Sequence, residues 1–221
     1  MGNRILGIKP TGRNVYLKPS KGIAFGNANA KQIKKIHAIV KVGADLFSAK
    51  GYRQTSMGDI ARVAKVTKGG VYHYFRSKTE ILYFICSSYV TLDLEGLEQS
   101  LGTMKETSEK VKFIIFRHVD HFTTHSSAAK TLLNESYNLP PPYRKEVKSI
   151  ERRYFDIVAE VVSEYQRFRS KKHIVTALTF TLFGMMNWIY RWYNPKGPLD
   201  PKRLSTIIFE TFVKGVDNVS L

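Results

Sequence analysis

From residue 31 onwards, apolar residues recur at the three- and four-residue spacing of amphipathic helices, and no stretch sustains the alternation of a β-strand. In residues 31–50, Ile36, Val40 and Ala44 fall on one face, and Gly51 follows as a stop signal. Further helices are expected over residues 56–64, 67–75, 78–100, 108–125, 128–138, 142–167, 172–192 and 201–217. The pattern predicts an all-α fold of about nine helices, with a small three-helix head and a larger apolar body.

Two of the expected helices, residues 56–64 and 67–75, are short and are separated by a tight turn. The second carries Lys, Tyr and His side chains. Ser77 and Glu80 then have the spacing of a capping box ahead of an apolar run, so a longer helix begins there. Two short helices joined in this way are typical of a helix-turn-helix.

The sequence around this motif is distinctive. The run T-S-M-x-D-I-A, followed by T-K-G-G-V-Y-H-Y-F-x-S-K-T-E-I-L, resembles the DNA-binding signature of the tetracycline-repressor (TetR/AcrR) family of transcriptional regulators. The similarity covers about residues 33–85, and beyond them only the layout matches. The resemblance implies a homodimer that binds a palindromic operator in double-stranded DNA. Residues 31–77 would form the helix-turn-helix domain, and residues 78–221 the ligand-binding and dimerisation domain.

By the same resemblance, the DNA contacts of the family fall on Ser56, Thr67, Lys68, Gly69, Tyr72, His73, Tyr74 and Lys78. Lys68 stands at the start of the recognition helix, where a long cation can reach a guanine edge or a phosphate. Lys78 lies in the first turn of the next helix and can neutralise a phosphate. Val71 and Phe75 have the spacing of core residues, and we expect them to pack against the first helix.

Positive charge is concentrated in the same part of the chain. The protein has 35 Lys and Arg against 18 Asp and Glu, a net charge of +17, and residues 1–80 carry 16 of the basic residues but only 3 of the acidic ones. This is the electrostatic footprint of a nucleic-acid-binding module. Residues 1–30 contain five basic residues, no acidic one and no apolar period, and we expect a flexible basic arm.

The expected helices of the body are rich in aromatic residues and methionine, which line hydrophobic pockets as well as cores. The resemblance implies a ligand pocket among the middle helices and a dimer interface formed by residues 172–192 and 201–217. The segment GMMNWIYRWYNPKGPLDP further resembles family members that sense acyl-CoA thioesters, which implies a repressor released by a hydrophobic effector such as an acyl-CoA. The candidate ligand-binding residues are Phe116, Tyr137, Phe183, Met186 and Asn187. Basic residues available to the phosphates of coenzyme A are Arg117, Arg152, Arg153 and Arg191.

Three histidines give an alternative. His118, His121 and His125 lie at positions i, i+3 and i+7 of one expected helix and therefore share a face, as the ligands of some metal sites do. Ordinary histidines on a polar or pocket-facing stripe have the same spacing. A DNA-binding regulator with a metal effector, or with no small-molecule effector, is the second hypothesis.

Other classes of protein fit the sequence poorly. Residues 173–190 lack Lys, Arg, Asp and Glu, but the run is short and interrupted by threonines, so we expect a buried helix and no membrane span. The only cysteine, Cys86, lies in an apolar run and predicts a buried thiol in a reducing cytoplasm. The sequence contains no Gly-rich phosphate loop and no nucleophile elbow, so we expect neither an enzyme nor a cofactor.

Overall fold

The computed structural model describes residues 29–164 and 171–218 of the chain. The basic arm expected at residues 1–30 therefore lies outside the described residues, apart from its last two positions. The first of these, Asn29, caps the first helix by accepting a hydrogen bond from the backbone N–H of Gln32 at 3.0 Å.

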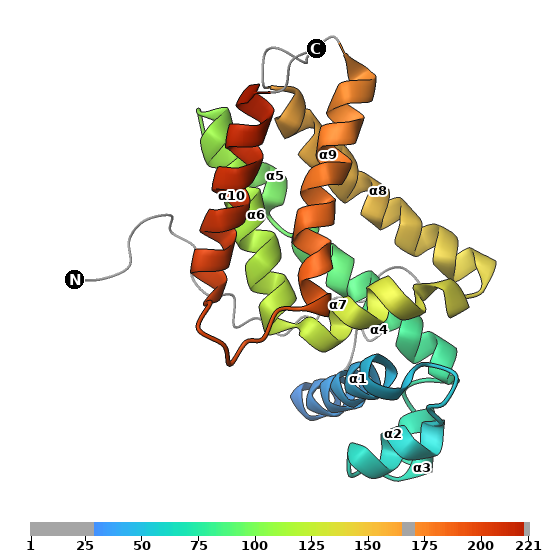
Figure 1. Ribbon diagram of the computed structural model, residues 1–221. Helices are drawn as coiled ribbons and strands as arrows, with labels where there is room; N and C mark the ends of the chain where they lie inside the picture. The colour runs from blue at the N-terminus through green and yellow to red at the C-terminus, as the bar shows by residue number, and fades with distance from the viewer. Residues whose placement is uncertain (1–28, 165–170, 219–221) are drawn as a thin grey trace.

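The described residues fold into helices without any strand, which confirms the predicted all-α class (Figure 1). The α-helices are α1 (Ala30–Lys50), α2 (Met57–Val63), α3 (Lys68–Tyr72), α4 (Lys78–Leu94), α5 (Leu97–Gly102), α6 (Thr107–Thr124), α7 (Ser126–Glu135), α8 (Pro141–Ser163), α9 (Lys172–Asn187) and α10 (Pro201–Asn218). Short 3₁₀ helices, η2 (Ser136–Asn138) and η4 (Trp188–Arg191), continue α7 and α9.

Helices α1, α2 and α3 form a small head at one end of the molecule (Figure 1). Its core contains Phe47, Ile60, Val71 and Phe75, each at most 1% exposed, so the prediction that Val71 and Phe75 pack inward is confirmed. These side chains come from α1, α2, α3 and the segment just after α3, and together they fix the short helices on α1. Apolar burial rather than helix propensity therefore holds the five-residue α3 in place.

Local capping sets the ends of the short helices. Ser56 and Asp59 form a reciprocal capping box at the start of α2, with both hydrogen bonds at 3.0 Å. Thr67 caps α3 through its side-chain oxygen, which accepts a hydrogen bond from the N–H of Gly70 at 3.0 Å. The turn between them passes through Lys65, whose φ of 54° lies in the left-handed region.

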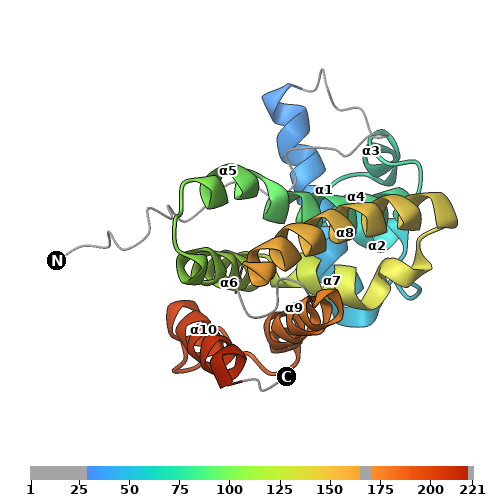
Figure 2. The same cartoon turned by 90° about the horizontal axis from the view of Figure 1, so that it is seen from above.

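Helix α4 begins in the head and continues into the body, where it is buried along most of its length (Figures 1 and 2). The sequence pattern predicted one helix over residues 78–100, and this is wrong. The backbone leaves the helix at Glu95, and Gly96 adopts a φ of 69°, a conformation that glycine adopts readily, before α5 starts.

Helices α9 and α10 lie side by side on the outside of the body, as both views show (Figures 1 and 2). Large apolar side chains remain exposed on these helices and on η4, namely Phe180, Trp188 and Ile207, each 46–62% exposed. Of the described residues, none belongs to a helix with both the length and the apolarity needed to cross a bilayer. Cys86 is fully buried in α4, as expected from its apolar surroundings.

Candidate functional site

The outer face of the head presents most of the residues expected to contact DNA. Thr67, Lys68, Gly69, Tyr72 and His73 are all exposed at α3, and Ser56 is exposed at the start of α2. Tyr74 is half-buried, and its ring meets that of His73 edge-on with centroids 4.8 Å apart. The structure thus brings these seven of the eight residues to one end of the molecule, where each is at least partly exposed.

Lys78 is the exception, because its ammonium group is already engaged inside the head. Its Nζ donates hydrogen bonds to the carbonyl oxygens of Tyr52, Arg53 and Thr55 at 2.9, 3.2 and 3.0 Å. It also lies 4.3 Å from the centroid of the Tyr52 ring. An ammonium has three hydrogens, and these three carbonyls use them all. The geometry makes Lys78 a brace for the loop between α1 and α2, which is an alternative role to the expected phosphate contact.

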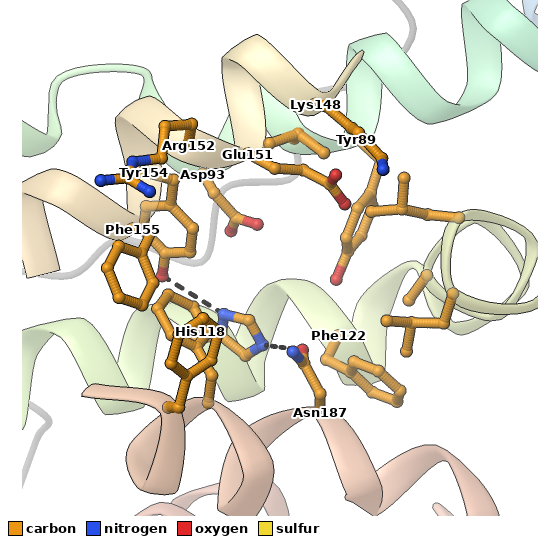
Figure 3. A pocket seen from close by; sticks show the side chains of 16 residues that line it. Tyr89, Asp93, His118, Phe122, Lys148, Glu151, Arg152, Tyr154, Phe155 and Asn187 are labelled. Carbon is orange, nitrogen blue, oxygen red and sulfur yellow. Dashed lines mark hydrogen bonds between the residues drawn. The ribbon is translucent and has the colours of Figure 1, made fainter. Parts of the chain in front are cut away.

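The body contains an open cavity of about 640 Å³ lined by five helices (Figure 3). Helix α4 contributes Tyr89, Val90 and Asp93, and α6 contributes His118 and Phe122. The other walls are Ala129, Leu132 and Leu133 from α7, Lys148, Glu151, Arg152, Tyr154 and Phe155 from α8, and Phe180, Phe183 and Asn187 from α9. Most of these side chains are apolar or aromatic, and the volume is typical of a small-molecule site.

The predicted ligand-binding residues divide into two groups. Phe183 and Asn187 line the cavity. Phe116, Tyr137 and Met186 do not. The ammonium of Lys112 lies over the ring of Phe116 and also over a phenylalanine ring of α10. Phe116 therefore faces α10 and not the cavity. Tyr137 is 60% exposed in a separate small hollow, and Met186 is fully buried in the core behind the wall.

His118 is the central polar group of the cavity wall. Its Nδ1 lies 3.2 Å from the Tyr154 hydroxyl and its Nε2 lies 3.1 Å from Asn187 Oδ1 (Figure 3). Burial lowers the pKa of His118, which favours the neutral ring. A neutral ring has one N–H, and we place it on Nε2 because the Asn187 oxygen can only accept; Nδ1 then accepts from Tyr154.

The other two histidines have different surroundings. His121 is buried, and its Nδ1 lies 2.7 Å from Asp93 Oδ1. His125 lies at the junction of α6 and α7, where burial lowers its pKa from 6.5 to about 4. Across the part of the chain that the structure describes, no three His, Cys, Asp or Glu side chains are arranged to hold a metal ion. The three histidines share a helix face, but the structure gives them separate roles.

The basic residues considered for coenzyme A phosphates are mostly engaged elsewhere. Arg117 donates to the carbonyl oxygens of Leu92, Asp93 and Glu95 at 2.7, 3.2 and 2.7 Å, and so caps the C-terminal end of α4. Arg152 and Arg153 form ion pairs with acidic side chains, and Arg191 stacks on Trp188 and Tyr190. Lys148, which is exposed at the rim of the cavity, is the better-placed cation.

Two helices connect the cavity to the head. Helix α4 lines the cavity with its later turns and is separated from the end of α3 by five residues. Helix α7 lines the cavity and also packs on α1, where Thr131 Oγ1 donates to the carbonyl oxygen of Ala44 at 3.2 Å. Arg53 of the head further donates to Asn138 of η2 at 3.4 Å. Two helices of the cavity wall are therefore in direct contact with the head.

Comparison with known proteins also divides the chain into a head and a body. Residues 39–83 match the family model described as bacterial regulatory proteins, tetR family, and residues 104–216 match the tetracyclin repressor-like, C-terminal domain. A TetR-family transcriptional regulator from Bordetella parapertussis 12822 superposes with a TM-score of 0.78 and 27% identity, covering 84% of this chain and 97% of that one.

Two further similarities cover most of the chain. AibR, solved with isovaleryl coenzyme A and operator DNA, has a TM-score of 0.71 at 24% identity over 80% of this chain and 97% of its own. The fatty acid metabolism regulator protein of Bacillus subtilis (strain 168) is 24% identical over 83% of this chain and 96% of its own length. With both halves matched by family models and the fold shared, the chain belongs to the tetracycline-repressor family of bacterial transcriptional regulators.

Proposed function

We propose that this protein is a dimeric transcriptional repressor of the cytoplasm that leaves a palindromic operator when a hydrophobic effector, with acyl-CoA as the first choice, enters its cavity. The observation that carries the proposal is the cavity of about 640 Å³, whose walls include both α4 and α7, the two helices that hold the head. No catalytic activity is part of the proposal.

The chemistry of the cavity favours an amphiphilic ligand. Phe122, Phe155 and Phe183 supply an apolar surface for a chain or ring, while Lys148 offers a cation at the rim for an anionic outer part. An acyl-CoA has this division between an apolar acyl group and a charged carrier. The relatives point the same way, because AibR is described with isovaleryl coenzyme A and the Bacillus subtilis protein by its role in fatty acid metabolism.

On the DNA side, we propose that the exposed side chains of α3 enter a major groove. Lys68 and Tyr72 would reach bases or phosphates, Thr67 and Gly69 would approach the backbone, and His73 would touch either. Ser56 and Tyr74 would add contacts at the edges of this surface. The exposed apolar side chains of α9, η4 and α10 would be covered by the same helices of a second copy, which would place two heads on one palindrome.

The switch would be a shift between two arrangements of the body. A ligand that fills the cavity favours the arrangement in which α4 and α7 stand further apart, and the heads then no longer match successive major grooves. A coupling of about 1–3 kcal/mol, or about 5–150-fold in DNA affinity, is enough for such a switch. By linkage, operator DNA must weaken ligand binding by the same factor.

The test uses fluorescence anisotropy with labelled DNA from upstream of the gene. Wild-type protein should bind this DNA, and an acyl-CoA should release it. In Phe183→Trp the larger ring occupies part of the cavity, so DNA binding should persist while release is lost. Phe180→Trp, at a more exposed part of the wall, is the matched control. If no acyl-CoA of any chain length releases the DNA, the effector class is wrong; if the upstream DNA is not bound, the regulatory role on that operon is wrong.

A further inference from the structure

One corner of the cavity is polar and incompletely satisfied. The Tyr89 hydroxyl is buried, and it has no hydrogen-bond partner in the described part of the chain. Burial raises the pKa of Tyr89 well above its usual range, so the hydroxyl keeps its hydrogen. Figure 3 shows this hydroxyl pointing into the cavity. A buried hydroxyl without a partner is costly, so it marks a place where a ligand atom is needed.

Asp93 lies next to Tyr89, one turn further along α4, and its carboxylate points into the same cavity (Figure 3). Only Oδ1 is used by the hydrogen bond to His121, in which the histidine Nδ1–H donates because a carboxylate can only accept. Among the hydrogen bonds between the Asp93 side chain and the described residues, none uses Oδ2. This oxygen can therefore accept a hydrogen bond from a ligand in the cavity. The corner therefore offers one hydroxyl that can donate and one carboxylate oxygen that can only accept.

His118 and the cations at the rim do not compete for this role. His118 is saturated, because Tyr154 and Asn187 occupy its two ring nitrogens. The cations that line the cavity, Lys148 and Arg152, are exposed at its rim, whereas Asp93 is 3% exposed. An anionic group would be repelled by the Asp93 carboxylate, and a carbonyl group would satisfy Tyr89 but give Asp93 nothing. A hydroxyl group both accepts and donates, and so satisfies both residues.

We propose that the effector carries a hydroxyl group on the part of its apolar body that reaches the inner end of the cavity, where it accepts from Tyr89 and donates to Asp93. This deepens the proposed function and rests on it for the ligand-binding role of the cavity. The class of ligand is a hydroxylated acyl group, with the hydroxyl distant from the charged end of the molecule. Selectivity for this hydroxyl resides in two residues of α4, the helix that follows α3 in the chain.

The experiment compares ω-hydroxyacyl-CoA with the unsubstituted acyl-CoA of the same chain length, from short to long chains, by calorimetry with the wild-type dimer. A hydrogen bond to a charged group in a buried site predicts about tenfold tighter binding of the hydroxylated compound at the best-fitting length. Tyr89→Phe keeps the ring and removes only the unpartnered hydroxyl, so it should fold normally and reduce the preference to about threefold or less. Asp93→Asn should lower the preference as well, and Tyr83→Phe, in the same helix but outside the cavity, should leave it unchanged.

The outcomes are distinct. Equal binding of both compounds to wild type would mean that water fills the corner, and the proposal would be overturned even though the acyl-CoA function stands. Tighter binding of an ω-amino compound than of the ω-hydroxy compound would also overturn it, because the site would then select a cation. Absence of binding by every CoA thioester would refute the proposed function. Primary alcohols and the alkanes of the same chain length, tested in parallel, would still report on the corner itself.

Discussion

Replacing Lys78 by methionine removes the ammonium that braces the loop between α1 and α2 while keeping most of the side chain. The lost contacts are the hydrogen bonds to the carbonyl oxygens of Tyr52, Arg53 and Thr55 and the position 4.3 Å from the Tyr52 ring. A hydrogen bond to a charged group contributes about 1.5–3 kcal/mol net. In the variant, water can donate to the carbonyl of the exposed Arg53 in place of the ammonium, which offsets part of the loss. We therefore expect the free energy of unfolding to fall by about 2–3 kcal/mol.

Thermal unfolding and the salt dependence of DNA binding together test this role. For a chain of this size, a loss of about 2–3 kcal/mol lowers Tm by about 5–10 °C. Below the transition temperature, Lys78→Met should keep the wild-type slope of log affinity against log salt. The reason is that the Lys78 ammonium already binds backbone carbonyls of the protein. Lys68→Met is the matched control: its exposed cation should leave Tm unchanged and reduce the slope by about one, as for one lost phosphate contact.

The reverse result would refute the reasoning. If Lys78→Met unfolds at the wild-type temperature and its salt slope is lower by about one, the ammonium contacts a phosphate in the complex and the brace has no energetic importance. A lower Tm combined with a lower slope would mean that Lys78 exchanges its carbonyl partners for phosphate on binding. The two measurements therefore separate a structural role from a DNA contact.

Three further changes test other features of the fold. Arg117→Met should lower the free energy of unfolding in urea by about 3 kcal/mol, because it uncaps three carbonyls at the end of α4; unchanged stability would exclude the cap. Gly96→Ala should cost about 1 kcal/mol because of its φ of 69°, whereas Gly102→Ala, with open space and no positive φ, should cost nothing; equal losses would contradict this. Burial lowers the pKa of His125 to about 4, so the unfolded chain binds more protons and stability should fall as the pH drops from about 6.5 towards 4. The loss is at most about 3 kcal/mol, less for a partly exposed ring, and urea titrations of His125→Gln should show a flatter pH dependence.

The helices of the head were predictable because their signals are local. Ser56, Thr67 and Ser77 each stand where a side-chain oxygen caps the helix that follows, and each does so in the structure. The break after α4 was missed because Leu94, Leu97 and Leu101 continue the apolar pattern through it. Its signal, a glycine next to a polar residue, is weaker than the periodicity around it.

The cavity was less accessible to sequence reasoning, because five helices separated along the chain line it. Helical spacing identifies which residues share a face, but it does not say which neighbour that face meets, and of the two candidates Phe183 and Phe116 only Phe183 lines the cavity. Tyr89 and Asp93 were missed altogether. Asp93 did carry a signal, since it is an acidic residue late in an otherwise apolar helix, and such a carboxylate needs a buried partner.

Two side chains that hold the head in place donate to its backbone carbonyls: Thr131 of the body to that of Ala44, and Lys78 at the start of α4 to those of the loop after α1. A carbonyl oxygen is present whatever side chain its residue carries. These particular hydrogen bonds therefore tolerate a change of side chain at their acceptor residues, provided that the backbone follows the same path. In practical terms, the protein is suited to chimeric sensors, in which a foreign recognition helix is grafted on while the cavity and its coupling are kept.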